Sequence, residues 1–248
     1  AVFKGAQPEE HIKLPDAALM RKWQDLSGGL IRLVTYAPET TDATAFEKYC
    51  LDNRIVLSVG HSDALRSQLR KSKAAHITHL FNAQRGLHHR EPGVTGHAFL
   101  EEDIYAEMIV DGLHIDPEMV KIAFKQKGAD RIELITDAMR AKGMGDGISE
   151  LGGQKVIVKE GQARLESGNL AGSVLGFQEA FRNIIAFTGC SILDAVKMSS
   201  VNQAREFDLV RKGGIAPGKD ADMVLLSESF AVERTISYGQ TVYKNNRK

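Results

Sequence analysis

The chain alternates between short apolar runs and longer stretches in which apolar side chains recur at helical spacing. The apolar runs predict five strands, at residues 30–36, 55–59, 76–78, 106–110 and 132–136. The stretches between them predict helices, at about residues 15–26, 42–52 and 63–73 and in the segment that begins at Asp116, and a long loop at residues 84–96. Such an alternation is typical of a parallel sheet covered by helices, the arrangement of an α/β barrel.

The helix that begins at Asp116 has clear start and stop residues. Asp116 can cap its first turn, and Gly128 follows its last turn. Met119, Ile122 and Ala123 stand at helical spacing, and we expect them to face the core.

The alternation breaks after residue 137. Residues 141–169 contain seven glycines and an alternating stretch at 155–159, which predicts a β-hairpin beside the barrel mouth. Two helices are expected at about residues 174–187 and 191–207. Residues 213–243 are rich in strand-forming side chains, so we expect them to belong to a separate small β domain.

Residues that can bind or serve a metal stand at the ends of the predicted strands. His61, His79 and Asp137 each follow one strand directly, and His114 follows a fourth. Because the loops after barrel strands open on one mouth, we expect these side chains to lie together. A single histidine in such a place is more often a core or capping residue, but packing alone does not explain four titratable residues at four strand ends. Two histidines and a carboxylate suit a catalytic divalent cation, so the sequence indicates metal-assisted hydrolysis.

Composition excludes several other classes of function. The 32 basic and 32 acidic residues balance, which gives no electrostatic reason to expect nucleic acid or a membrane surface as a partner. No run of eighteen apolar residues occurs, so no spanning helix is expected. The two cysteines, Cys50 and Cys190, form no C-x-x-C pair and favour a reducing, cytoplasmic setting over a disulfide framework.

The segment from Gln84 to Arg90 concentrates two arginines and two histidines in a chain without net charge. The planar guanidinium of arginine suits two phosphate oxygens at once, so an anionic substrate group could bind here. A solvated surface loop would explain the same residues equally well. We interpret the remaining histidines His11, His76 and His97 as structural.

These motifs resemble those of the amidohydrolase superfamily and, within it, of the family of N-acetylglucosamine-6-phosphate deacetylases. The matching segments span nearly the whole chain in the family's order, at residues 60–62, 78–83, 90–93, 111–114, 136–138, 170–173 and 217–222. The resemblance implies a cytoplasmic, homodimeric, metal-dependent amidohydrolase that releases acetate from N-acetyl-D-glucosamine 6-phosphate. It also implies a divalent metal ion, either zinc or iron.

The resemblance assigns roles to individual residues. It implies that His61 and His79 are metal ligands, that Asp137 is the acid/base carboxylate, and that His114 contacts the substrate and polarises its amide carbonyl. The other implied substrate contacts are with the sugar phosphate, through Asn82, the backbone of Ala83 and Arg90, and with the acetyl end, through Leu170, Ala171 and Gly172. The arginine is expected to reach across a dimer interface.

Five strands do not close a barrel that needs eight. We therefore expect about three βα units, roughly a hundred or more residues, to precede Ala1, together with the opening of the β domain and a metal-binding glutamate within about ten residues upstream. Within the chain, we assign residues 1–208 to the catalytic barrel and residues 209–248 to the C-terminal part of a small β-sandwich domain. The metal site beside His61 and His79 should accordingly be incomplete. Gln84 stands where the resembling family usually has methionine.

Two other functions fit the same residues. A different amidohydrolase, acting on a cyclic amide or a nucleobase, would share His61, His79 and Asp137 but would have no use for Arg90. A catalytically silent barrel that binds a sugar phosphate would keep the cavity and release no acetate.

Overall fold

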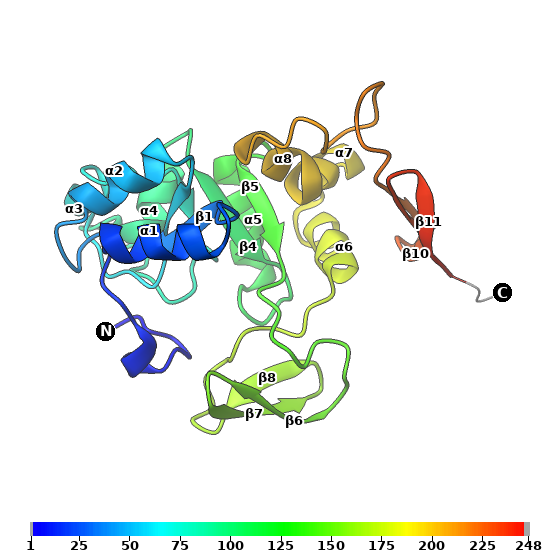
Figure 1. Ribbon diagram of the computed structural model, residues 1–248. Helices are drawn as coiled ribbons and strands as arrows, with labels where there is room; N and C mark the ends of the chain where they lie inside the picture. The colour runs from blue at the N-terminus through cyan, green and yellow to red at the C-terminus, as the bar shows by residue number, and fades with distance from the viewer. Residues whose placement is uncertain (1, 246–248) are drawn as a thin grey trace.

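The computed structural model describes residues 2–245 of the chain. Its main sheet contains five parallel strands in chain order, β1 (Leu33–Tyr36), β2 (Val56–Val59), β3 (His76–Ile77), β4 (Tyr105–Ile109) and β5 (Ile132–Ile135). Each strand pairs with the next one along the chain, so the connections are crossovers that carry helices (Figure 1). The five predicted strands and the α/β class are confirmed, although β1, β2, β3 and β5 are shorter than predicted and β4 begins one residue earlier.

The helices follow the same order along the chain. They are α1 (Ala17–Leu26), α2 (Thr44–Asp52), α3 (Arg66–Leu69), α4 (Gly93–Leu100), α5 (Pro117–Lys127), α6 (Phe177–Thr188), α7 (Ile192–Val196) and α8 (Asn202–Glu206). A short 3-10 helix spans Glu9–His11, and a π-helical turn, Lys197–Val201, joins α7 to α8. None of the helices within residues 2–245 combines the length and the apolar character that crossing a membrane requires.

Two predictions between β2 and β4, one of a helix and one of a loop, have the wrong bounds. Of the helix predicted over residues 63–73, only α3 forms. Glu39 accepts from the Ser62 hydroxyl at 2.8 Å and from the Asp63 backbone N–H at 2.6 Å and so holds the loop that precedes this helix. The region predicted as a loop up to Gly96 contains the start of α4 instead. Most residues of α4 are buried on all sides, so its sequence carries no amphipathic period that would predict a helix.

Helix α5 begins and ends as predicted, and Ala123 faces the core as expected, but Met119 and Ile122 do not. Val120 and Ala123 are buried, whereas Met119 is 38% and Ile122 is 49% exposed. Because apolar residues occupy two adjacent stripes of this helix, the sequence pattern alone does not decide which stripe packs on the sheet.

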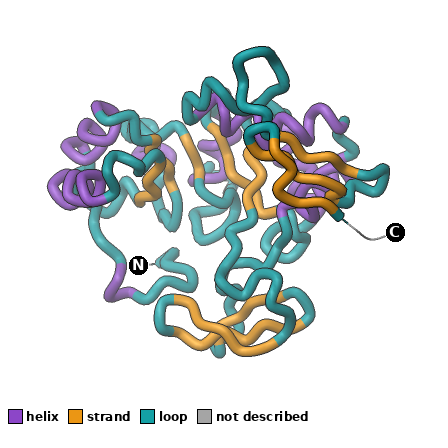
Figure 2. Tube along the Cα trace, turned by 45° about the vertical axis from the view of Figure 1, so that its right-hand side comes forward, coloured by secondary structure: helices purple, strands orange, loops and turns teal. Residues whose placement is uncertain are grey.

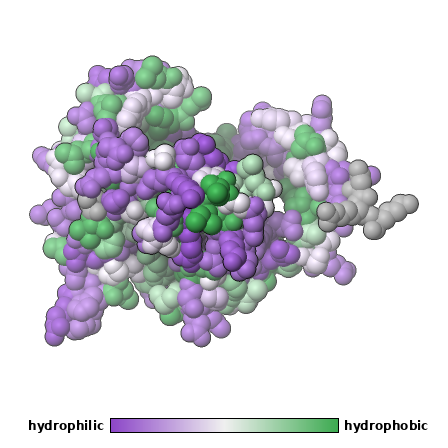
Figure 3. All heavy atoms as spheres, turned by 90° about the horizontal axis from the view of Figure 1, so that it is seen from below, coloured by the Kyte–Doolittle hydropathy of each residue, from purple (hydrophilic) through white to green (hydrophobic). Residues whose placement is uncertain are grey.

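Two antiparallel sheets flank the parallel one. The first contains β6 (Gly147–Leu151), β7 (Gln154–Lys159) and β8 (Gln162–Leu165), which adds one strand to the predicted hairpin. The second contains β9 (Met223–Leu226), β10 (Val232–Ser237) and β11 (Gln240–Lys244), in the predicted strand-rich tail. Figure 2 shows the β6–β8 sheet below the loops of the main sheet, and the face seen from below is largely hydrophilic with scattered hydrophobic groups (Figure 3).

The main core lies between the parallel sheet and helices α4, α5 and α6. Its fully buried side chains include Ile77, Met108 and Ile132, one each from β3, β4 and β5. A second cluster, around Met20 and Phe46, packs α1 and α2 on β1 and β2. These two cores fix the strands whose ends carry the polar residues.

Candidate metal and active site

The ends of the parallel strands open on one cavity of about 790 Å³. The sequence-predicted site residues that line this cavity are His61, His79, Asn82, Ala83, His114, Asp137, Leu170 and Gly172. They come from the loops after β2, β3, β4 and β5 and from the segment after β8. The structure therefore brings together most of the site that the sequence predicted.

The two histidines predicted as metal ligands face each other. Their Nε2 atoms lie 3.0 Å apart. The Nδ1 of His61 donates to the carbonyl oxygen of Phe3 at 2.8 Å, which leaves its Nε2 unprotonated in the neutral ring. Burial, followed by the neighbouring His79, lowers the pKa of His61 and favours that neutral form. Two imidazole nitrogens this close fit a shared cation, and His61 and His79 are thus able to contribute two of its ligands.

The backbone at the strand ends is bent into a conformation that side chains rarely adopt. His61, His79 and Asp137 have φ angles of 51°, 34° and 47°. Residues held in this region cost about 1–3 kcal/mol each, and they concentrate at functional sites. Gly60 makes the turn at His61 possible, because a Cβ at that position would lie 2.7 Å from Thr35 Cγ2 and 2.9 Å from Thr78 Cβ.

Asp137 and His114 face the cavity with different environments. The surrounding protein shields the Asp137 carboxyl from solvent and raises its pKa, and the neighbouring His79 and His114 partly offset this rise. One side of the residue remains exposed toward the cavity. The Nδ1 of His114 lies 2.6 Å from Asp111 Oδ2. Burial would raise the pKa of Asp111, but its hydrogen bonds to His114 lower it, so this carboxylate stays ionised. Asp111 therefore fixes the orientation of the His114 ring.

The N-terminal segment, residues 2–8, is not among the predicted site residues, although residues 4–7 resemble the loop that follows the family's metal-binding glutamate, and it forms one wall of the cavity. The side-chain amide nitrogen of Gln7 lies 3.3 Å from the Nε2 of His61. The backbone carbonyl of Phe3 accepts from the other ring nitrogen, Nδ1. The segment is fixed in turn by Gln154 on β7, whose side chain donates to the carbonyl oxygen of Ala6 at 2.6 Å. No sequence periodicity marks these contacts.

Two predicted site residues do not line the cavity. Arg90 is exposed in the loop before α4, where a backbone bridge between His88 and Glu91 closes a turn. Ala171 is fully buried in the cluster beside β7 and β8.

Comparisons with known proteins place these residues in a family context. Residues 3–242 match the model of the amidohydrolase family. The chain is 44% identical over 243 residues to the N-acetylglucosamine-6-phosphate deacetylase of Bacillus subtilis, and the match covers 96% of this chain and 61% of the relative. The chain thus spans about three fifths of the length of that protein.

Solved structures of N-acetylglucosamine-6-phosphate deacetylases also resemble this chain. The crystal structure of N-acetylglucosamine-6-phosphate deacetylase from Thermotoga maritima superposes with a TM-score of 0.92 at 40% identity, over 98% of this chain and 66% of that one. A mutant of the Mycobacterium smegmatis deacetylase, in complex with N-acetyl-D-glucosamine 6-phosphate, superposes with a TM-score of 0.93 at 34% identity. This second match covers 97% of the present chain and 65% of the other.

Proposed function

We propose that this chain, which belongs to the amidohydrolase family, carries catalytic residues of a metal-dependent enzyme that hydrolyses the acetamide of N-acetyl-D-glucosamine 6-phosphate. The products are glucosamine 6-phosphate and acetate. The observation that carries the proposal is the single cavity in which His61, His79, His114 and Asp137 meet. The similarity to deacetylases over nearly the whole chain supports the choice of substrate.

His61 and His79 would hold a divalent cation, which we expect to be zinc or iron. Such a cation lowers the pKa of a water molecule to about 7 and so supplies a nucleophile at neutral pH. The role of the two histidines is to present unprotonated nitrogens, and the hydrogen bond from His61 to Phe3 enforces this for one of them.

Asp137 is the proposed proton carrier. Its carboxylate takes a proton from the attacking water and returns it to the amine nitrogen that leaves, so that the C–N bond breaks without releasing a strongly basic anion. A raised pKa makes the Asp137 carboxylate a stronger base than an ordinary aspartate, so it takes the proton from the water more readily.

His114 is the proposed donor to the carbonyl oxygen. With Nδ1 held by Asp111 Oδ2 at 2.6 Å, the other ring nitrogen, Nε2, is the one that would donate to the substrate. A donor at this position stabilises the negative charge that develops on the oxygen as the carbonyl carbon becomes tetrahedral.

Asn82 and the backbone of Ala83 are the proposed sugar-phosphate contacts within the chain, and Leu170 to Gly172 would enclose the acetyl end. Arg90 is exposed and does not line the cavity of its own chain, which favours a contact with the phosphate bound in the cavity of a second copy. We therefore propose a homodimer. We further propose a division at residue 208 between a catalytic barrel and a small β-sandwich domain, and a cytoplasmic location.

The test is acetate release by the intact protein after chelation and after return of zinc or ferrous iron. The substrates are N-acetylglucosamine 6-phosphate, N-acetylgalactosamine 6-phosphate and unphosphorylated N-acetylglucosamine. We expect activity that depends on metal and strongly favours a phosphorylated sugar. Absence of acetate release under all metal conditions would refute the deacetylase proposal.

A substitution of Arg90 distinguishes the loss of a phosphate contact from a general loss of activity. Arg90→Ala should raise KM for the phosphorylated substrate far more than for the unphosphorylated one, while Arg182→Ala, at an exposed arginine of α6, should change neither. Equal effects of Arg90→Ala on both substrates would exclude a phosphate contact. A fully active monomer would exclude the dimer.

A further inference from the structure

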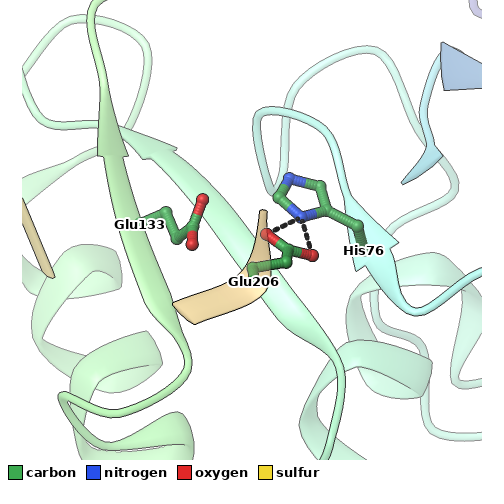
Figure 4. A group of neighbouring side chains, drawn as sticks. All are labelled: His76, Glu133 and Glu206. Atoms are coloured by element: carbon green, nitrogen blue, oxygen red, sulfur yellow. Dashed lines mark hydrogen bonds and ion pairs between the residues drawn. The ribbon is translucent and has the colours of Figure 1, made fainter. Parts of the chain in front are cut away.

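A second group of titratable side chains lies within the fold, apart from the cavity. His76 on β3, Glu133 on β5 and Glu206 on α8 have potential ligand atoms within 4.8 Å of one another (Figure 4). His76 is 0% and Glu133 is 2% exposed. Three elements that are far apart in sequence therefore bring a nitrogen and two carboxylates to one buried place.

The contacts within this cluster leave two buried polar atoms, the Nε2 of His76 and the Oε1 of Glu133, without a hydrogen-bond partner among the described residues. The Nδ1 of His76 lies 2.9 and 3.0 Å from the two carboxylate oxygens of Glu206. Its Nε2 lies 3.3 Å from the Oε1 of Glu107 on β4. The Oε1 of Glu133 is buried without a hydrogen-bond partner among the described residues, and Figure 4 shows this carboxylate directed toward Glu206.

The charges of the cluster do not balance. Three carboxylates face one imidazole, so even with a protonated ring the group carries two excess negative charges when all carboxylates are ionised. Burial would lower the pKa of His76, but Glu107 and Glu206 outweigh it and raise that pKa to about 10. Burial and the carboxylate of Glu206 raise the pKa of Glu133 to about 8. Buried charge of one sign is costly unless protons or a cation compensate it.

We propose that His76, Glu133 and Glu206 form a divalent-cation site separate from the one at His61 and His79. An imidazole nitrogen with carboxylate oxygens is a donor set for zinc, manganese or ferrous iron. The separations of about 3 Å between Nδ1 and the Glu206 oxygens suit neighbouring ligands of one ion. The Nε2 of His76 would then face the carboxylate of Glu107 at 3.3 Å, and a nearby carboxylate is the usual partner of a metal-bound histidine.

The position of this site gives the cation a structural role. It would tie α8 to β3 and β5. It would also orient Glu107, whose Oε2 accepts the backbone N–H of His79 at 3.2 Å. The cation would thus support the backbone of a proposed catalytic ligand without reaching the cavity.

Metal analysis of the intact protein tests the site independently of the deacetylase proposal. In a His61→Ala/His79→Ala background, protein loaded with Mn²⁺ and desalted should retain about one ion per chain. Adding Glu133→Gln and Glu206→Gln should remove it. Adding Glu47→Gln, at a buried glutamate bound to Tyr36 elsewhere in the fold, should leave it in place.

A measurement on the unmutated protein guards against misfolded variants. Crystals grown with Mn²⁺ should show an anomalous difference peak between His76 and Glu206, in addition to any peak at His61. Absence of that peak, or no Mn²⁺ retained in the His61→Ala/His79→Ala protein, would overturn the proposal and leave protons as the balancing charge. Acetate release decides the proposed function whichever result is obtained.

Discussion

Replacing Gly5 with alanine tests whether the N-terminal segment positions the proposed metal ligand His61. Gly5 has a φ of +59°, and a Cβ at this position would lie 3.1 Å from the Cε1 of His61. The same ring is held on its other side by Phe3 at 2.8 Å, so the ring and the segment cannot both keep their places. The substitution therefore combines backbone strain with a displacement of the imidazole by a few tenths of an ångström.

The two effects have different magnitudes. A left-handed conformation costs an alanine about 1–2 kcal/mol relative to glycine, which should appear as a loss of unfolding free energy. A misplacement of about 1 Å can cost about 10² in rate, so a smaller shift should lower kcat by about 10-fold. Gly28→Ala is the matched control, because Gly28 has a φ of +66° and nothing within 4 Å of the added Cβ.

Urea unfolding and acetate release under saturating substrate would be measured for both variants. We expect similar losses of stability, with a loss of turnover and of bound metal only in Gly5→Ala. Wild-type turnover in Gly5→Ala would show that the segment does not position His61, and equal losses of turnover in both variants would assign the effect to strain alone.

Three further predictions concern single side chains. Asp137→Asn should keep the fold and metal content but lower kcat by at least about 10²-fold, because an amide cannot carry the proton; near-normal turnover would remove Asp137 from the mechanism. His79→Ala should lower the metal content of the purified protein, and unchanged elemental analysis would make this histidine structural. Burial, followed by the charge of Arg66, lowers the pKa of His97 in the folded protein from 6.5 to about 4. Between these two pH values the unfolded chain binds a proton at His97 that the folded protein does not, so the free energy of unfolding should fall as the pH drops from about 6.5 toward about 4. The full shift corresponds to roughly 3 kcal/mol, and urea unfolding of His97→Gln across this range should show a flatter dependence.

The sequence predicted the strands and the residues at their ends because both are local properties. An apolar run is visible in the sequence, and a barrel places whatever follows each strand at one mouth. His61, His79, His114 and Asp137 can therefore be grouped from the sequence alone. Residues that reach the cavity from elsewhere carry no such mark. Phe3 binds a ring 58 positions further along the chain, and only the folded structure shows that contact.

The buried cluster around His76 is partly predictable from the charged residues inside β4 and β5. Read alone, His76 gives no reason to assign it more than a structural role, since its partner Glu206 lies 130 positions away. Glu107 and Glu133, however, interrupt two otherwise apolar strands, and the register of β4 and β5 places them side by side. A charged residue inside a buried strand must find a partner, and two such residues in adjacent strands require a shared one. Carboxylates at matched positions of neighbouring strands therefore predict a buried polar cluster from sequence alone, although the ligand that α8 contributes becomes visible only when the helix packs on the sheet.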